Sequence, residues 1–454
     1  MEKQASNNFN KKCDRTFQYI AAVAASLATF CTGTVFGWPS LITDDLLSGE
    51  LGFPLTPNDL GWICSCSSIG AALLTLFIGP ICDRIGRKTA MLLLVTVFEL
   101  GWALIIFSTE VWMLILGRFF TGMAGGSYCV TVSLYIAEVA VKEVRGALGG
   151  LTQLMISCGI LFANVLGAFA STRVLSVACA MIPVLFGAVL LYMPETPVYL
   201  LRKGRDEECK ATLEKLLGKV SVEEEYEELK AHLKCGTTPL TTMEVIKKRS
   251  VRRACVIGVG LALLKIFSGI DPVTSYLSHI FKETNTLVEP ENACIVFAVS
   301  QVLAVVPQVL LVDRLGRRIL LITSQMLMAL ALGTTALSLL FRNEDPVLEY
   351  VPLVALCLFI VGFSIGIGPI GWIITAEIFD EEVKGRAMSV CTFLVWFLAF
   401  VNVKMFEILE EEWNVSVPLL VYCGVSSAGA FFVWARVPET KNKSFAEIEK
   451  ELTG

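Results

Sequence analysis

Charged residues and histidines are scarce in this 454-residue sequence. Only 17% of the residues are charged, against about 25% in an ordinary soluble domain, whereas 55% are hydrophobic. The net charge of -5 supplies no basic surface for nucleic acid. The two histidines, His232 and His279, are too far apart to suggest a metal site. We therefore expect an integral membrane protein with no cofactor, no metal and no nucleic-acid partner.

Sequence patterns of enzymes and disulfide frameworks are also missing. No HEXXH, Walker or nucleophile-elbow pattern occurs, so we do not expect an enzyme. The fifteen cysteines are scattered through apolar runs, and even the closest pair, Cys64 and Cys66, would point to different faces of a helix. We interpret them as small apolar side chains. The first fifteen residues are polar, so the first apolar run is expected to remain as a membrane span and not to be a cleaved signal peptide.

The sequence contains twelve apolar runs, each of about the 20 residues that cross a bilayer as a helix. They lie near 17–36, 61–80, 89–108, 112–135, 147–170, 174–193, 252–281, 293–312, 319–341, 352–375, 386–408 and 417–437. This pattern predicts an all-α membrane protein with twelve transmembrane helices in two pseudo-symmetric six-helix bundles. The expected divisions are a cytoplasmic N-terminus (1–16), an N-terminal bundle (17–202), a helical linker (203–250), a C-terminal bundle (251–437) and a cytoplasmic C-terminus (438–454).

The short basic loops predict the orientation, because Lys and Arg are retained on the cytoplasmic side. Four such loops, at 83–88, 141–146, 313–318 and 383–386, fall on one side, and the loop after the first span has acids but no Lys or Arg. Both termini and the linker, whose 205–233 segment has the pattern of an amphipathic helix, are therefore expected in the cytoplasm. The sequon at Asn414 then falls outside, as a candidate glycosylation site. We expect a multi-pass protein of the plasma membrane.

An internal repeat relates the two halves. DRIGRK after span two recurs as DRLGRR after span eight, Glu138 with Arg145 recurs as Glu377 with Lys384, and PET at 194–196 recurs at 438–440. Two six-span halves are typical of a secondary transporter whose halves rock about a central site. Charged side chains at the cytoplasmic helix ends could pair within each half and hold the inside shut; the alternative is that they only anchor the topology. These residues are Asp83, Arg84, Arg87, Glu138, Arg145 and Glu195 in the first half and Asp313, Arg314, Arg317, Glu377, Lys384 and Glu439 in the second.

Seven motifs in order along the chain carry a resemblance to a known family. They are DRIGRK, GRFFTGMAGG, YIAEVAVKEVRGALG, PETPVYL, DRLGRR, GPIGWIITAEIF and PETKNKSFAEIE. Together they resemble the sugar porter family of the major facilitator superfamily, and within it the insect facilitated trehalose transporters and animal facilitative glucose transporters. The resemblance implies alternating access around a sugar-sized cavity in the bilayer, with a small-molecule substrate. We also expect a monomer, and we place Arg118 of GRFFTGMAGG with the cytoplasmic gate.

The resemblance also implies substrate residues, and the sequence departs from some of them. Gln153, Gln301 and Trp372 match the family pattern. Span seven usually reads Gln-Gln-x-Ser-Gly-x-Asn, but this chain has Lys265 and Ile266 in place of the glutamines and Asp271 in place of the asparagine. Span eleven has Val-Trp at 395–396 instead of Asn-Trp, and span ten has GPIGW instead of GPIPW. The candidate substrate-binding residues are Gln153, Lys265, Ser268, Asp271, Tyr276, Gln301, Trp372 and Trp396.

Lys265 and Asp271 fall on one polar stripe of span seven when it is drawn as a helix with 3.6 residues per turn. A charge at mid-bilayer costs about 2.5–3.5 kcal/mol on insertion scales, so this stripe should face a cavity, a ligand or a partner side chain. Either the two residues shape the substrate site, or they pair within the protein, or with groups on span ten or eleven, and lock the packing. Ser268, Gly269 and Pro272 predict a break in the helix at this point, and the five glycines and one proline of GFSIGIGPIGW predict a similar break in span ten.

Span one contains no acid between Phe17 and Thr43, whereas proton-driven members of the family usually carry one there. Facilitated diffusion of a sugar or related polyol is therefore the leading interpretation. Two alternatives stay open: a carrier for a charged organic solute that uses Lys265 and Asp271, and a non-transporting nutrient receptor with the same fold.

Overall fold

Helices are the only regular elements in the part of the chain that the computed structural model describes, which is residues 16–41, 53–218, 222–235, 249–284, 286, 288–341, 348–379, 381–441, 443, 447–448 and 450–451. Twelve of the helical segments are long and apolar enough to cross a membrane. Their apolar surface suits lipid, and their backbone amides are bonded within each helix, as a bilayer requires. The predicted all-α architecture with twelve spans is confirmed.

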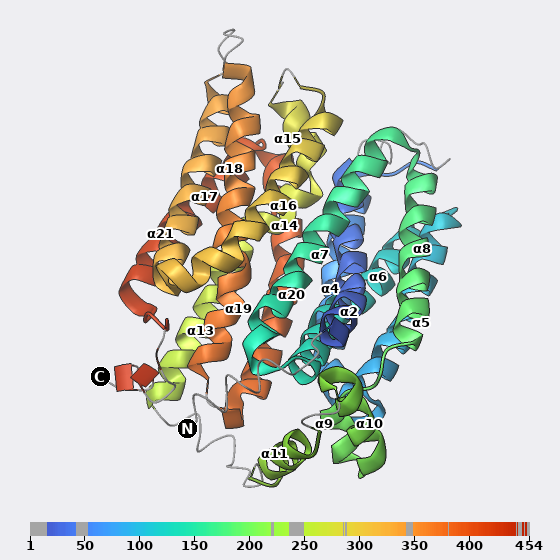
Figure 1. Cartoon of the computed structure of the whole chain (residues 1–454). Helices are drawn as coiled ribbons and strands as arrows, with labels where there is room; N and C mark the ends of the chain where they lie inside the picture. The colour runs from blue at the N-terminus through green and yellow to red at the C-terminus, as the bar shows by residue number, and fades with distance from the viewer. Residues whose placement is uncertain are drawn as a thin grey trace.

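The spans form two bundles that stand side by side (Figure 1). The first bundle contains α2 (Thr16–Gly37), α4 (Pro57–Ile85), α5 (Arg87–Ile106), α6 (Val111–Val139), α7 (Lys142–Phe169) and α8 (Thr172–Leu191). The second contains α13 (Arg249–Phe267), α14 (Ile270–Ser275), α15 (Leu277–Glu283), α16 (Pro290–Leu315), α17 (Arg317–Leu340), α18 (Val351–Ile365), α19 (Ile367–Ile378), α20 (Glu381–Glu412) and α21 (Ser416–Arg436), with a short 3-10 helix, η1 (Leu348–Tyr350), before α18. The bundles meet where α4 packs on α20 and α7 packs on α16.

Three short helices, α9 (Pro197–Arg202), α10 (Asp206–Leu217) and α11 (Val222–Cys235), lie at one end of the bundles (Figure 1). Leu213, Leu216 and Leu217 of α10 are buried, which confirms the amphipathic character predicted for this segment. The side chain of Gln18 at the start of α2 donates to the Leu216 carbonyl (3.0 Å) and accepts from the backbone N–H of Val141 (3.1 Å). This hydrogen-bonded bridge ties the linker to the first bundle. We call this side of the molecule the α9–α11 end and the other side the opposite end.

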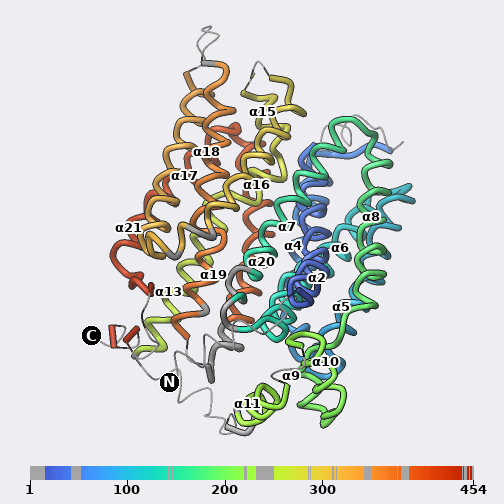
Figure 2. Tube along the Cα trace, viewed as in Figure 1, coloured from blue at the N-terminus to red at the C-terminus, as the bar shows by residue number. Residues whose placement is uncertain are grey.

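Two spans of the second bundle are interrupted near their middles, as the sequence predicted. The seventh span stops at Phe267 and resumes at Ile270, and Gly269 between them has a left-handed φ of 87°. The tenth span breaks at Gly366, between α18 and α19. There the Ser324 hydroxyl donates to the Gly362 carbonyl (2.7 Å) and accepts from the N–H of Ile367 (3.1 Å). The two broken spans lie together, with α13 against α19 (Figure 2).

Candidate functional site

Lys265 lies at the end of α13, just before the break in the seventh span. Its ammonium sits over the indole ring of Trp372 on α19, 4.9 Å from the ring centroid. It also lies close enough to the Asp271 carboxylate, and to the Cys129 thiol of α6, to interact electrostatically with both. Lys265 therefore reaches from one bundle toward the other and covers a face of the tryptophan that the family resemblance assigns to substrate.

Asp271 lies in the first turn of α14, on the other side of the break. Its Oδ2 atom is buried and has no hydrogen-bond partner among the described residues. No ion pair within 4.0 Å joins Asp271 to Lys265, although both side chains are described. The two charges flank the broken turn without direct contact. In this conformation they therefore do not hold the packing together as an ion pair. An unpaired buried carboxylate oxygen is costly unless a hydrogen-bond donor reaches it.

Ser268 and Tyr276 belong to the same broken segment. The buried Ser268 hydroxyl donates to the Lys265 carbonyl (2.7 Å) and so caps the end of α13. The Tyr276 ring stacks on Phe406 of α20, with the centroids 5.2 Å apart, and its hydroxyl has no partner among the described residues. Ser268 thus serves the backbone of the turn, whereas Tyr276 keeps a hydroxyl that can still bind a ligand or water.

The other predicted substrate residues lie on surrounding helices. Gln153 is half-buried on α7, and Gln301 is buried on α16 with an Oε1 atom that lacks a partner among the described residues. Trp396 on α20 stacks on Phe36 of α2, with 5.6 Å between centroids and 12° between planes, and its Nε1 is buried and unpaired within the described part of the chain. No described hydrogen bond joins the side chains of these residues to Lys265 or Asp271. The structure therefore brings Lys265 and Trp372 into contact, and Asp271, Tyr276, Gln301 and Trp396 each keep a polar atom with no partner among the described residues.

Two residues that hold the broken span were not identified from the sequence. Asn402 of α20, which is fully buried, donates from Nδ2 to the Ile266 carbonyl (2.7 Å). The Tyr422 hydroxyl of α21 donates to Asn402 Oδ1 (2.9 Å), and the Tyr422 ring occupies the space where a side chain at Gly269 would lie. A polar residue inside an otherwise apolar run was the available signal for Asn402, but its partner could not be named before the fold was known.

At the opposite end, α4 closes on α20 through a set of contacts that we call the α4–α20 clasp. Its members are Asn58, Gly61 and Trp62 on α4 and Phe400, Lys404 and Glu407 on α20. The Lys404 ammonium donates to Asn58 Oδ1 (3.1 Å) and pairs with Glu407 (2.8 Å), and it lies 4.9 Å from the Trp62 ring centroid. Gly61 packs so closely on the Glu407 carboxylate that a Cβ there would overlap it. The clasp joins the two bundles at this end of the interface.

The repeated charged motif of the first bundle forms one hydrogen-bonded cluster at the α9–α11 end. The Arg87 guanidinium pairs with Asp83 (2.8 Å) and Glu138 (2.9 Å). Glu195 of the first PET motif accepts from the backbone N–H groups of Arg87 (3.0 Å) and Lys88 (3.1 Å), and so caps the start of α5. A carboxylate at a helix N-terminus is stabilised by the free N–H groups and the helix dipole. Arg84 contributes its carbonyl, which accepts from the Tyr199 hydroxyl (3.3 Å).

The second bundle repeats this arrangement. Glu439 of the second PET motif accepts from the backbone N–H groups of Arg317 (3.0 Å) and Arg318 (3.1 Å) at the start of α17. Arg317 also pairs with Glu377 (3.4 Å), and the Arg314 carbonyl accepts from Lys441 (2.7 Å). Burial alone would raise the pKa of Glu439, but backbone N–H donors from Lys441, Arg317, Arg318 and Thr440 hold it below its usual value. The predicted charge pairing within each half is present for Asp83, Arg87 and Glu138 and for Arg317 and Glu377, whereas Arg84, Glu195, Arg314 and Glu439 make contacts that involve the backbone.

Arg118 does not belong to this cluster, contrary to the sequence prediction. It lies near the start of α6, whereas Glu138 lies at the other end, and twenty residues of helix span about 30 Å. The buried Arg118 guanidinium donates to the Val35 carbonyl (2.7 Å), the Ile63 carbonyl (3.2 Å) and the Ser67 hydroxyl (3.2 Å). It therefore links α2, α4 and α6 in the half of the bundle nearer the opposite end. The motif that contains Arg118 gave no information about where along α6, between the two ends of the bundle, this residue lies.

Several predicted residues fall outside what the structure describes or outside both sites. The side chains of Arg145, Asp313 and Lys384 are not among those described. Asn414 is exposed in the turn between α20 and α21, and its Oδ1 accepts from the N–H of Ser416 (3.0 Å). Glycosylation of Asn414 stays a prediction.

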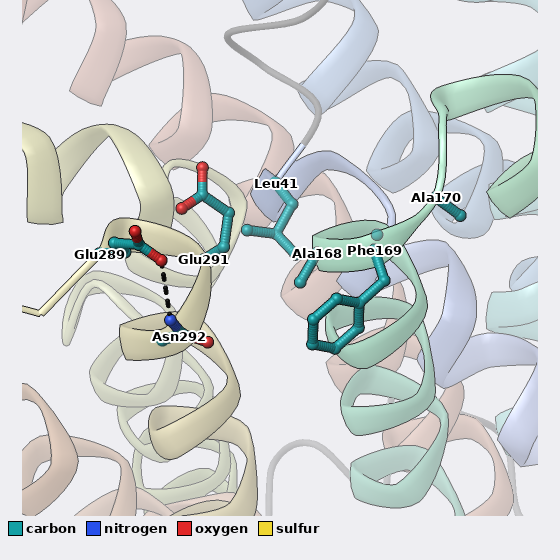
Figure 3. Close-up of a pocket in the computed structure, with 8 residues that line it drawn as sticks. Leu41, Ala168, Phe169, Ala170, Glu289, Glu291 and Asn292 are labelled. Carbon is teal, nitrogen blue, oxygen red and sulfur yellow. Dashed lines mark hydrogen bonds between the residues drawn. The ribbon is translucent and has the colours of Figure 1, made fainter.

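A cleft of about 330 Å³ lies at the opposite end, between the end of α7 and the start of α16. It is lined on one side by Leu41 and Phe169 and on the other by Glu289, Glu291 and Asn292 (Figure 3). Asn292 donates to Glu289 (3.0 Å), as the dashed line shows. None of the predicted substrate residues lines this cleft, so it is separate from the broken-helix site.

Comparison with known proteins adds a sequence family and a fold. A family model described as "Sugar (and other) transporter" matches residues 10–452. The chain is 31% identical over 455 residues to a facilitated trehalose transporter Tret1-2 homolog of Drosophila simulans, with 98% of this chain and 92% of the relative covered. It is also 31% identical over 457 residues to the solute carrier family 2, facilitated glucose transporter member 8, of Mus musculus, with coverage of 96% and 94%.

Among solved structures, the fold is similar to that of the xylose transporter XylE from E. coli. Its partially occluded inward-open conformation has a TM-score of 0.82 at 20% identity, with 94% of this chain and 100% of that chain covered. Its inward-open conformation has a TM-score of 0.79 at 21% identity, with coverage of 96% and 98%. The likeness extends over both bundles.

Proposed function

Because the chain belongs to the sugar transporter family of the major facilitator superfamily, we propose that it carries a neutral sugar or related polyol across the membrane by facilitated diffusion. Trehalose and glucose, which two of its relatives are named for, are the first candidates. We place the substrate at the broken seventh span, between Lys265 and Asp271. The observation that carries this proposal is the Oδ2 atom of Asp271, which is buried without a partner in the described part of the chain, across the break from a lysine that is not ion-paired to it.

A sugar hydroxyl suits this pair of charges because it both donates and accepts hydrogen bonds. Lys265 can only donate and an ionised Asp271 can only accept, so neighbouring hydroxyls of one substrate can satisfy both at once. Hydrogen bonds to ionised groups are about twice as strong as those between neutral groups. The two charges therefore take over the role of the family's amides. A purely anionic substrate would be repelled by Asp271, and a purely cationic one by Lys265.

Trp372 gives the site an apolar wall. Lys265 covers one face of the ring in the structure, and the pyranose ring of a sugar would compete with the ammonium for that surface. Gln153, Gln301, Tyr276 and Trp396 offer further donors and acceptors, and we assign them as secondary substrate contacts. The Ser268 hydroxyl donates to the Lys265 carbonyl and so stabilises the turn.

We also propose the orientation and the cycle. The α9–α11 end carries the basic DRxGR loops and is placed in the cytoplasm with both termini, in the plasma membrane, and the carrier acts as a monomer. The α4–α20 clasp then closes the extracellular side. The Arg87 and Arg317 clusters hold the cytoplasmic ends of the helices in each half, where they would form the surfaces that meet when the inside shuts. The absence of an acid between Phe17 and Thr43 supports transport without proton coupling.

Uptake by purified protein in vesicles tests this function directly. A panel of glucose, trehalose, a linear polyol, glucuronate and glucosamine should show uptake of neutral members and little uptake of either charged member. Protein-free vesicles and a Trp372→Ala variant serve as controls. Uptake of only a charged member would favour the charged-solute carrier, and binding without uptake would favour a receptor.

A further inference from the structure

We infer that Asn402 is a positioning residue for substrate: it holds the break between α13 and α14 in the shape that aims Lys265 and Asp271 at the same ligand. The inference rests on the proposed function for the position of the site. It deepens that function by assigning a role to a residue of α20 that none of the seven motifs contains. Tyr422 assists by fixing the orientation of the Asn402 amide.

The break creates the need for such a residue. Where the helix stops at Phe267, backbone carbonyls lose their partners in the next turn, and in a membrane interior they cannot turn to bulk water. The Ile266 carbonyl accepts from the N–H of Gly269 (3.1 Å) and from Asn402 Nδ2 (2.7 Å). Since Ile266 follows Lys265 directly, the hydrogen bond from Asn402 fixes the backbone that carries the lysine.

The chemistry of the three groups determines how the amide is turned. A backbone carbonyl can only accept, so the Asn402 NH2 must face Ile266 and the Asn402 oxygen must face the Tyr422 hydroxyl. The Tyr422 ring also packs against Gly269, whose φ of 87° suits glycine. Tyr422 therefore contacts the turn directly and through Asn402, so the broken segment is held from both α20 and α21.

The two faces of α20 have different tasks. Val395, Ala399, Asn402 and Phe406 are buried toward α13 and α14, with Val395 and Ala399 packed on Ile266 and Phe406 stacked on Tyr276. Trp396, Phe400, Lys404 and Glu407 lie toward the first bundle. Because the faces are separate, a change at Asn402 should alter substrate affinity while leaving the clasp in place.

Asn402→Leu tests the hydrogen bonds, because leucine branches at the same carbon as asparagine but can neither donate nor accept. Tyr422→Phe is the milder variant, since it keeps the ring against Gly269 and removes only the hydroxyl. Val403→Ala is the control for lost packing at a neighbouring buried position of α20. Uptake of trehalose and glucose is measured as KM and as maximal rate per copy at the surface.

We expect KM to rise about tenfold for Asn402→Leu, which removes both hydrogen bonds of the amide, and about threefold for Tyr422→Phe, which removes one, because each loss loosens the backbone that positions Lys265 and Asp271. The maximal rate should change less than threefold, and Val403→Ala should keep the wild-type KM. Hydrogen exchange of the 264–276 backbone, measured without any sugar, should be faster in Asn402→Leu and Tyr422→Phe and unchanged in Val403→Ala.

The two measurements separate failure of this inference from failure of the proposed function. If wild type takes up neither sugar, the proposed function is wrong for those substrates, and exchange at 264–276 alone decides the role of Asn402. If both variants keep the wild-type KM and the wild-type exchange rate, Asn402 does not position the broken span. An equal rise of KM and an equal loss of exchange protection in Val403→Ala would also overturn the inference, because general packing would then explain the effects.

Discussion

Lys404→Met should open the extracellular side of the carrier. Lys404 contacts both bundles. Its ammonium donates to Asn58 and lies over the Trp62 ring on α4, and it also donates to Glu407 on its own helix. Methionine keeps the length and the contact with the Trp62 ring but removes the charge and the donors. The change therefore removes attraction between the bundles with little loss of packing.

The size of the effect follows from those contacts. Hydrogen bonds from a charged group contribute about 1.5–3 kcal/mol when buried, but the Lys404 side chain is 16% exposed at the rim of the interface, so we take about 1–1.5 kcal/mol for its bonds to Asn58. The cation–π contact with Trp62 adds about 0.5–1 kcal/mol. A total of about 2 kcal/mol shifts the equilibrium between closed and open roughly 30-fold.

Cys64 provides a native reporter for this opening. It lies one turn after Gly61 on α4, is 3% exposed and neighbours Tyr276 of the second bundle. In intact cells, a membrane-impermeant maleimide should label Cys64 of Lys404→Met ten- to thirtyfold faster than in wild type. The same variant with Cys64→Ser identifies the labelled site. Lys210→Met is the matched control, because that lysine also pairs with a glutamate (2.9 Å) and lies over a tyrosine ring (4.7 Å), but at the α9–α11 end.

If Lys404→Met and Lys210→Met both label at the wild-type rate, the clasp does not close the extracellular side. Faster labelling in both would point to general loosening of the protein and would equally refute the reasoning.

Three further predictions concern other parts of the molecule. Gly61→Ala should raise the labelling of Cys64 without removing any charge, because its Cβ would meet the carboxylate across the clasp, whereas Gly424→Ala, where the space is open, should not. Glu439→Gln should lower the melting temperature by a few degrees, since a helix cap contributes about 1 kcal/mol. The pKa of Glu439 is lower in the folded than in the unfolded protein, so its contribution is present above about pH 4.3 and is lost as the pH falls through the folded pKa. The difference in melting temperature from wild type should therefore vanish in acid. Sugar uptake should not respond to a protonophore, in wild type or in Glu99→Gln, which neutralises a partly buried carboxylate on α5. Proton-driven uptake in wild type that Glu99→Gln abolishes would show proton coupling.

The twelve spans and both helix breaks could be predicted because their causes are local. Apolar run length determines whether a segment can cross the bilayer, and glycine or proline beside polar residues weakens a helix at that point. The duplicated motifs similarly predicted acid–base pairs within each half, and Arg87 with Glu138 and Arg317 with Glu377 are such pairs.

Contacts between distant helices could not be predicted in this way. Lys265 was expected to face a ligand, to pair with Asp271 or to pair with a group on span ten or eleven, and the sequence alone could not single out the ring of Trp372 on α19. Arg118 was placed with the cytoplasmic gate, but its depth is set by where α6 begins, and its partners are carbonyls of α2 and α4 and the Ser67 hydroxyl. Asn402 and Lys404 are ordinary polar residues in the sequence, and their roles follow only from the faces that α20 presents to each bundle.

The most direct test of the site is sugar counterflow through vesicles that contain wild type, Lys265→Gln, Asp271→Asn or the triple variant Lys265→Gln, Ile266→Gln and Asp271→Asn. Each single change leaves the other charge buried without an opposite charge nearby, and it replaces a hydrogen bond between the substrate and a charged group, which contributes about 1.5–3 kcal/mol, with a weaker one. We therefore predict that trehalose or glucose counterflow falls at least tenfold in each single variant and returns to the wild-type level or higher in the triple variant, whose amides again donate and accept. A triple variant that reaches the membrane but carries no sugar, beside wild type that carries it readily and single variants that match wild type, would contradict the account and show that Lys265 and Asp271 do not bind the substrate.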